Sequence, residues 1–256
     1  MKRVVFFFLI GLMACDSAPK DNRSSGIVTM PVFPRTIKKD SVDHLLPAEI
    51  SIAYSSTEQN LINAGLIDIK SIDSTVVVDL KYSTTDNFLG LDVYGTFNKC
   101  YLQPDVANKL KTAQQLLRSK FPYYNIVVYD AARPRSIQYK MWDTIDVPVV
   151  ERSKYLSNPQ NGSLHNFGAA VDVSIIDENG YVLDMGTGYD YFGELAYPRE
   201  EERMNREGKL TRIQLLNREL LRTVMLQAGF AGITTEWWHF NSCTRQEAFS
   251  RYKIIE

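Results

Sequence analysis

Two short segments of the chain supply side chains that can bind a divalent metal ion. His165 and Asp172 come from SLHNFGAAVD, and His239 comes from TEWWHF. Two imidazole nitrogens and one carboxylate oxygen suit zinc, and three protein ligands leave one coordination position open for water or substrate. A structural zinc site instead has four protein ligands. The residue types therefore predict a catalytic centre with one zinc ion per chain.

Glu236 lies three residues before His239. Positions three apart in an extended strand point to opposite faces, so the two share a site only if a bend separates them. A carboxylate placed there without binding metal would take a proton from activated water. The chain has only one other histidine, His44, in a polar N-terminal stretch. The small residues 168–170 are expected to let the backbone run close to a metal or substrate.

The two segments resemble the motifs S-x-H-x-x-G-x-A-x-D and E-x-W-H of the zinc D-Ala-D-Ala peptidase superfamily. Three further segments resemble its D-alanyl-D-alanine dipeptidase family in the same order: DLKYSTTDNFLG (79–90), YDAARPR (129–135) and MGTGYDYF (185–192). The resemblance covers roughly residues 70–245. It implies zinc-dependent hydrolysis of D-Ala-D-Ala or a similar small dipeptide. One departure is DAARP at 130–134, where the family has D-G-Y-R-P. The missing aromatic residue beside the arginine is expected to change the width of the pocket and the strictness of its substrate specificity.

Arg133 is the candidate for stabilising negative charge on the carbonyl oxygen during hydrolysis. Arginine stays charged at any relevant pH and offers a planar fork of donors. The resemblance points to the same residue, through its Arg-Pro step. The alternative is a surface ion pair, for example with Asp130, a role that the neighbouring Arg135 fits better.

The resemblance also implies three substrate-binding residues. Ser163 would meet the carboxylate of a free dipeptide, and Asp190 and Tyr82 would meet its ammonium group. Each has a structural alternative: Ser163 and Asp190 as turn residues, and Tyr82 as a core aromatic with a solvated hydroxyl.

The N-terminus, MKRVVFFFLIGLMAC, predicts a signal peptide at 1–14, because its apolar run is too short to span a bilayer. The residues around Cys15 resemble a bacterial lipobox, which implies lipidation there; an ordinary signal peptide is the alternative. Residues 15–57 lack periodicity and are expected to tether a catalytic domain at 58–256. The sequence thus predicts an exported protein, lipid-anchored to a bacterial membrane and facing the periplasm or cell envelope.

The formal net charge of −1 and the lack of a basic cluster argue against nucleic-acid binding. No glycine-rich phosphate loop follows an expected strand, which argues against a nucleotide. The irregular order of elements favours an α+β single domain with a central, largely antiparallel sheet flanked by helices. Periodicity predicts strands at 74–81, 125–129, 169–176 and 237–240, and helices at 105–121 and 213–228, the latter with Leu216, Leu220, Val224 and Ala228 on one face.

Cys100 and Cys243 remain in the catalytic domain. An exported protein meets oxidising conditions, so a disulfide between them is one expectation, and two buried thiols are the other. Metal binding by either cysteine is disfavoured because the set of two histidines and one aspartate is already complete.

Two rival functions stay open at this point. A peptidoglycan D,D- or L,D-carboxypeptidase or endopeptidase of the same superfamily would need a groove open to long substrates. A non-catalytic cell-wall binding module would keep zinc for structure alone, but such a module has no need of Glu236 beside the metal.

Overall fold

The computed structural model describes residues 54–256. The predicted signal peptide, Cys15 and residues 16–53 of the predicted tether lie outside the described residues. Helix α1 (Ser56–Asn63) begins within the range predicted as tether. A capping box stabilises its start, because Ser55 Oγ accepts from Glu58 N and Glu58 Oε2 accepts from Ser55 N.

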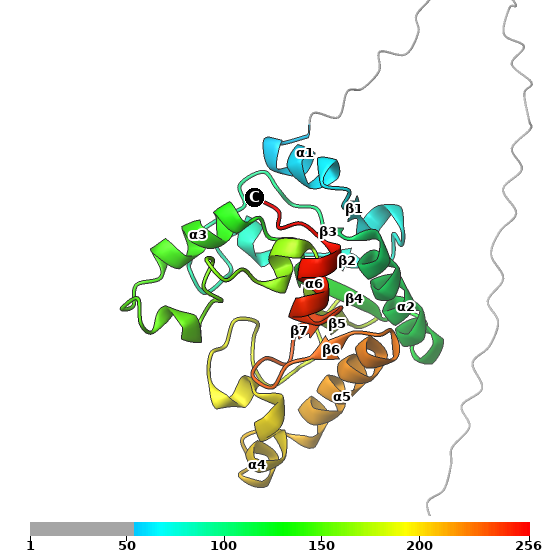
Figure 1. The fold of residues 1–256 in the computed structure, drawn as a ribbon. Helices are drawn as coiled ribbons and strands as arrows, with labels where there is room; N and C mark the ends of the chain where they lie inside the picture. The colour runs from blue at the N-terminus through cyan, green and yellow to red at the C-terminus, as the bar shows by residue number, and fades with distance from the viewer. Residues whose placement is uncertain (1–53) are drawn as a thin grey trace, which may run out of the picture. The chain divides into compact units, whose positions relative to one another are not determined.

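A five-stranded sheet forms the centre of the fold (Figure 1). Its strands follow the order β2-β4-β5-β7-β6, and every neighbouring pair is antiparallel except the parallel pair β2 and β4. A separate antiparallel pair joins β1 and β3. The predicted α+β class with a largely antiparallel sheet is confirmed. The strand bounds are β1 Ile67–Asp68, β2 Val77–Val78, β3 Tyr101–Leu102, β4 Asn125–Asp130, β5 Ala170–Ile176, β6 Ala231–Gly232 and β7 His239–Asn241.

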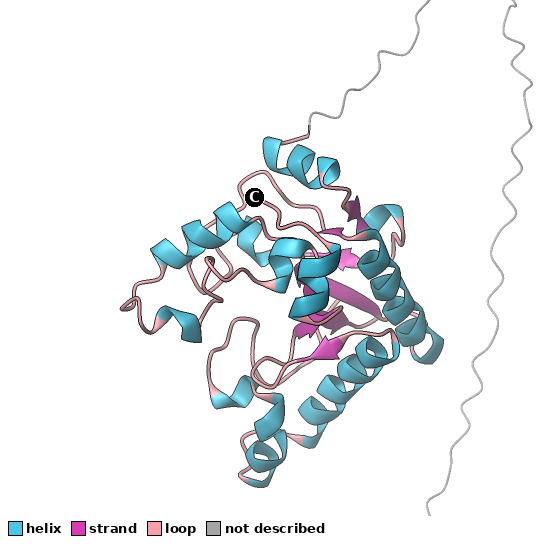
Figure 2. Cartoon of the chain, in the orientation of Figure 1, coloured by secondary structure: helices cyan, strands magenta, loops and turns pink. Residues whose placement is uncertain are grey.

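Helices surround the sheet, as the cyan ribbons of Figure 2 show. The long helices α2 and α5 pack against each other, α2 also against β4 and α5 also against β6. The remaining α-helical bounds are α2 Pro104–Lys120, α3 Arg135–Thr144, α4 Glu201–Arg206, α5 Arg212–Gln227 and α6 Arg245–Arg251. The 3₁₀ helices are η1 Ile69–Ser71, η2 Lys81–Ser83, η3 Arg152–Lys154, η4 Leu164–Phe167, η5 Glu194–Ala196 and η6 Pro198–Glu200.

The bounds of α2 and α5 fall within a residue of the prediction, and Val224 and Ala228 of the predicted apolar face of α5 are buried, but the prediction is wrong at Leu216. Leu216 is 44% exposed, whereas Arg218 is buried together with Leu221, Val224 and Met225. Arg218 tolerates burial because Met185 O, Leu195 O and Glu201 accept from its guanidinium. Hydrophobic periodicity alone cannot anticipate a buried arginine.

Two predicted strands are shorter in the structure. Only Val77–Val78 of the range 74–81 pairs with β4, and the chain then turns into η2. The C-terminal strand begins at His239 rather than at residue 237, because residues 234, 235, 237 and 238 bend. Both differences lie next to residues of the candidate site.

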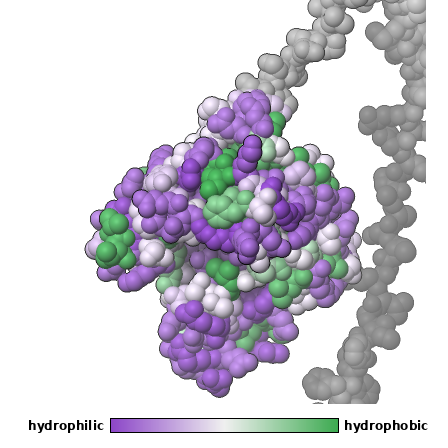
Figure 3. All heavy atoms as spheres, viewed as in Figure 1, coloured by the Kyte–Doolittle hydropathy of each residue, from purple (hydrophilic) through white to green (hydrophobic). Residues whose placement is uncertain are grey.

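The face seen in Figure 3 is mostly hydrophilic, with hydrophobic residues in small separate groups. Scattered exposed apolar side chains of this kind are ordinary on folded proteins. Within residues 54–256, no helix combines the length and the apolar character needed to cross a membrane.

Candidate active site

The strand register places three titratable side chains in one row across the sheet. Asp130 on β4 pairs with Asp172 on β5, and Asp172 pairs with His239 on β7. Residues directly opposite each other on neighbouring strands project to the same face. The centre of the sheet therefore presents two carboxylates and an imidazole side by side.

His165 reaches this row from η4, just before β5. Gly168 ends η4 in the left-handed conformation (φ 64°), and a Cβ there would lie 2.7 Å from Leu66 Cδ2. Glycine is therefore required for the turn that joins His165 to β5. The small residues expected near the site thus have two roles: Gly168 makes this turn, and Ala169 and Ala170 are fully buried beside it.

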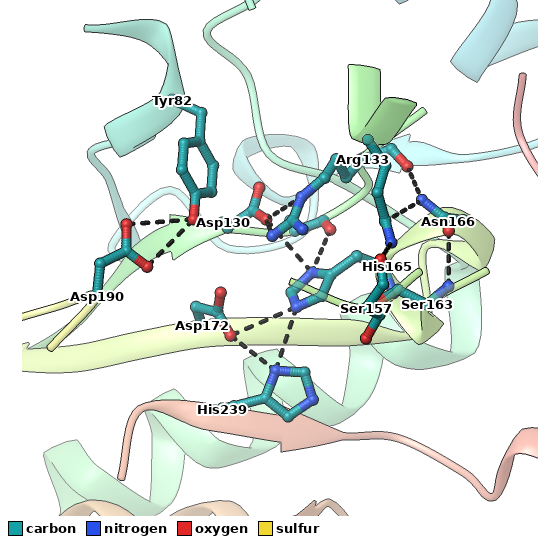
Figure 4. Close-up of polar contacts among 12 residues, drawn as sticks. Tyr82, Asp130, Arg133, Ser157, Ser163, His165, Asn166, Asp172, Asp190 and His239 are labelled. Atoms are coloured by element: carbon teal, nitrogen blue, oxygen red, sulfur yellow. Dashed lines mark hydrogen bonds and ion pairs between the residues drawn. The ribbon is translucent and has the colours of Figure 1, made fainter. Parts of the chain in front are cut away.

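The two imidazoles and one carboxylate converge on a common point (Figure 4). His239 Nδ1 lies 2.9 Å from Asp172 Oδ1, and His165 Nε2 lies 3.2 Å from His239 Nδ1 and 3.4 Å from Asp172 Oδ1. Ligand atoms about 2.0–2.1 Å from a tetrahedral zinc are separated by about 3.3 Å. The spacing of the three predicted ligands thus fits a metal ion.

Neighbouring groups orient each of these three side chains. Ala131 O lies 2.7 Å from His165 Nδ1, so a proton on Nδ1 leaves Nε2 free to bind metal. Asn241 Oδ1 lies 2.9 Å from His239 Nε2, and the Tyr189 hydroxyl donates to Asp172 Oδ2 at 2.9 Å. Outer contacts of this kind are typical of protein metal sites.

The electrostatics of the cluster favour positive charge at its centre. Burial alone would raise the pKa of Asp172, but the two imidazoles hold it well below its usual range. Burial lowers the pKa of His239, but its hydrogen bond to Asp172 raises it to about 9. A positive charge, whether a proton or a metal cation, is therefore favourable at this position.

Glu236 lies beside the cluster because the chain bends around it. Its Oε2 is 4.0 Å from His239 Nδ1, so the condition for sharing the site is met. Partial burial raises the pKa of Glu236. A carboxylate with a raised pKa next to a metal-binding cluster can both accept and return a proton.

Arg133 is buried and lines the same cavity. Its guanidinium contacts Asp130, whose other oxygen accepts from the Tyr94 hydroxyl at 2.5 Å. It also lies 5.1 Å from the centre of the Tyr82 ring. The structure thus combines the two alternatives, since Arg133 faces the site and forms an ion pair with Asp130. Arg135 forms a separate, more exposed ion pair with Glu256.

Asp190 and Tyr82 lie together at one end of the cavity (Figure 4). The Tyr82 hydroxyl donates to both carboxylate oxygens of Asp190, at 3.1 and 3.2 Å, and Phe88 N donates at 3.4 Å. Among the described residues, no cationic side chain forms an ion pair with Asp190. Burial first, and then repulsion from Asp172, raises the pKa of Asp190 well above its usual value.

Ser163 lies at the other side of the cluster and begins η4. Its Oγ accepts from His165 N at 3.3 Å, so the turn alternative is correct, and the same residue lines the cavity. Buried Asn166 fixes this region, because its side chain accepts from Ser163 N and donates to Arg133 O and Gln138 Oε1.

The site residues enclose a cavity of about 270 Å³. This volume falls just below the range of about 300–1,000 Å³ that is usual for small-molecule sites. A second cavity of about 490 Å³ adjoins it and shares Tyr155, Phe192 and Glu236. The first cavity suits a small substrate, and the second leaves space beside Glu236.

The predicted disulfide is wrong, because Cys100 and Cys243 are both free. Cys100 is buried beside β1, where its carbonyl accepts from Ile69 N, and Cys243 follows β7. Cys100 directly precedes β3 of the separate two-stranded sheet, whereas Cys243 comes two residues after the end of β7 in the five-stranded sheet. Burial raises the pKa of the Cys100 thiol well above its usual value.

Sequence analysis missed two contributors to the site, Tyr189 and Asn241, and it named Asp130 only as a possible partner of Arg133. Tyr189 adjoins Asp190 in the MGTGYDYF segment, and Asn241 lies two residues after His239 on the same strand face. Their closeness in sequence to predicted site residues could have identified both as candidates. The position of Asp130 opposite Asp172 depends on strand register, which the sequence does not reveal.

An open three-residue metal site with a free carboxylate beside it defines a metal-dependent hydrolase. The family model of the M15 peptidases, described as D-ala-D-ala dipeptidase, matches residues 62–253. The chain belongs to this metallopeptidase family.

Individual relatives agree with this assignment. The chain is 32% identical over 175 residues to a D-alanyl-D-alanine dipeptidase of Escherichia coli (strain K12), covering 68% of this chain and 83% of that protein. It is 29% identical over 168 residues to the D-alanyl-D-alanine dipeptidase of a Synechocystis strain, covering 55% and 68% of the two chains. The corresponding enzyme of Enterococcus faecium is 26% identical over 177 residues, covering 63% and 83%.

Proposed function

We propose that the protein is a zinc-dependent dipeptidase that hydrolyses D-Ala-D-Ala or a similar small dipeptide. The position of Asp190 carries this proposal. Its carboxylate shares a small cavity with the metal-binding cluster, accepts from Tyr82 and Phe88 N, and has no cationic partner among residues 54–256. An incoming ammonium group would supply the missing positive charge.

Zinc held by His165, Asp172 and His239 would supply a Lewis acid for the scissile carbonyl and lower the pKa of the attacking water toward about 7. Glu236 takes the proton of that water and returns it to the leaving amine. The Arg133 guanidinium stabilises the developing oxyanion, and Asp130 holds it in place. Ser163 meets the substrate carboxylate, and Asp190 with Tyr82 meets the ammonium.

A substrate comparison tests this proposal. Zinc-loaded protein is expected to release D-alanine from D-Ala-D-Ala and to prefer it over N-acetyl-D-Ala-D-Ala at least tenfold in kcat/KM. Acetylation removes the charge that Asp190 recognises and leaves a desolvated carboxylate unpaired. A chelator is expected to abolish turnover, and zinc to restore it. Equal cleavage of the two substrates would contradict the dipeptidase assignment.

The adjoining cavity of about 490 Å³ favours a second candidate function. A peptidoglycan D,D- or L,D-carboxypeptidase or endopeptidase would use such space for a longer peptide. Release of D-alanine from muropeptides faster than from the free dipeptide would support this candidate instead.

The N-terminal sequence supports export and lipid attachment at Cys15, which would hold the catalytic domain at a bacterial membrane. Cells grown with labelled fatty acid are expected to label the wild type and not a Cys15→Ser variant. Label on both proteins, or on neither, would contradict attachment at this residue.

A further inference from the structure

The cavity has a second arginine besides Arg133, and the proposed roles leave this arginine unused. Arg245 is the first residue of α6 and lines the cavity together with Ser163. Its Nη1 donates to Gly162 O at 3.0 Å, and its Nη2 contacts Asn161 O. These two carbonyls hold the guanidinium beside the backbone of the residue that precedes Ser163.

The charge of Arg245 has no carboxylate partner among residues 54–256. Its two hydrogen-bond acceptors are neutral carbonyls, and its guanidinium also lies 5.4 Å from the centre of the Phe249 ring. Arg251 on the same helix pairs with Asp105, and Arg133 in the same cavity pairs with Asp130. A guanidinium has five N–H donors, so two carbonyls leave donors of Arg245 for a ligand.

The hydroxyl of Ser163 complements this guanidinium. Its oxygen accepts from His165 N, while its own proton has no acceptor among the described residues. A carboxylate at this end of the cavity would therefore meet one O–H donor and one cationic donor. Paired donors of this kind form strong charge-assisted hydrogen bonds.

The two ends of the cavity carry opposite charges. Figure 4 shows Asp190 on one side of the metal-binding cluster and Ser163 on the other, and Arg245 holds the loop just before Ser163. A free dipeptide carries an ammonium at one end and a carboxylate at the other. The arrangement of charge in the cavity is thus complementary to a zwitterion that spans the cluster.

We propose that Arg245, acting with Ser163, binds the carboxylate of the dipeptide and thereby selects substrates with a free carboxyl terminus. This inference rests on the proposed dipeptidase function. Because Arg245 is exposed at the cavity mouth, water screens its charge, and its effect is on substrate choice and the Michaelis constant. A substrate extended or amidated at this end lacks the charge that Arg245 binds.

The test compares D-Ala-D-Ala with D-alanyl-D-alaninamide on zinc-loaded protein. Wild type is expected to prefer the free acid about tenfold or more in kcat/KM. Arg245→Gln is expected to raise the KM of the free acid about fivefold, with the amide unaffected, so that most of the preference is lost and only the contribution of Ser163 remains. Arg245→Lys keeps the charge and is expected to retain part of the preference. The matched control is Arg251→Gln on the same helix, which is expected to keep the wild-type preference.

The ratio of kcat/KM for the free acid to kcat/KM for the amide distinguishes a role in carboxylate binding from a purely structural role of Arg245. Loss of the contacts to Asn161 and Gly162 alone would slow both substrates equally, and that result would overturn the role of Arg245. An unchanged preference for the free acid in Arg245→Gln would also overturn the role of Arg245. The dipeptidase function would still be supported in that case, provided that wild type hydrolyses the free dipeptide. Absence of turnover of the free dipeptide by zinc-loaded wild type would overturn both proposals.

Discussion

Replacing Asp190 by asparagine tests how the site recognises the substrate ammonium. Asp190 is the only non-glycine residue with positive φ among residues 54–256, at 59°. Asparagine adopts this left-handed conformation more readily than most residues, so Asp190→Asn removes the charge without adding backbone strain. The asparagine oxygen can still accept from the Tyr82 hydroxyl. Alanine would confound loss of charge with strain.

The magnitude follows from the contacts of Asp190. A hydrogen bond that involves a charged group contributes about 1.5–3 kcal/mol, more than a neutral one. Asp190 has two oxygens that accept from Tyr82, and no cationic side chain forms an ion pair with it in the described part of the chain. A loss of about 2 kcal/mol on removing the charge corresponds to roughly a 30-fold decrease in kcat/KM for the free dipeptide.

The assay measures D-alanine release from D-Ala-D-Ala and from its N-acetyl form across pH. Burial raises the pKa of Asp190 above its usual value. When the pH is below that raised pKa, the carboxyl group is protonated and does not attract the ammonium. Preference for the free amine is therefore expected at pH values above the pKa of Asp190 and is lost as the pH falls through this pKa. Asp190→Asn is expected to show little preference at any pH.

The control is Tyr82→Phe, which removes the hydroxyl that donates to Asp190 and leaves the charge. This variant is expected to keep a preference for the free amine. The reasoning is refuted if Asp190→Asn discriminates against the N-acetyl substrate as strongly as wild type does.

Four further outcomes are expected. Glu236→Gln lowers kcat at least about 100-fold while bound zinc, measured by metal analysis, is retained. Tyr189→Phe removes the donor to a metal-binding carboxylate and weakens zinc affinity about 10- to 100-fold in competition with a chelator. Arg218→Met leaves one buried and one partly buried carbonyl unpaired, and urea titration is expected to show a loss of about 2 to 4 kcal/mol in the free energy of unfolding. Unfolded, unreduced protein that lacks Cys15 is expected to show two reactive thiols, Cys100 and Cys243.

The sequence alone determined the class of chemistry, because metal binding restricts residue types severely. His165, Asp172 and His239 were identifiable from ligand chemistry, and a carboxylate near the last of them suggested a proton carrier. The bounds of α2 and α5 were also predictable, since helix periodicity is a local property of the chain.

Tertiary structure decided how those residues meet. Register between strands places Asp130 beside Asp172, and packing buries Arg218, which lies outside the predicted apolar face of α5. The loop before η4 brings Gly162, the residue before Ser163, into contact with Arg245, although 83 positions separate the two in the sequence. Cys100 and Cys243 are free and lie next to strands of two different sheets, an arrangement that only the assembled fold decides. All these features join segments far apart in the chain, so their energies depend on the assembled fold and leave no local pattern in the sequence.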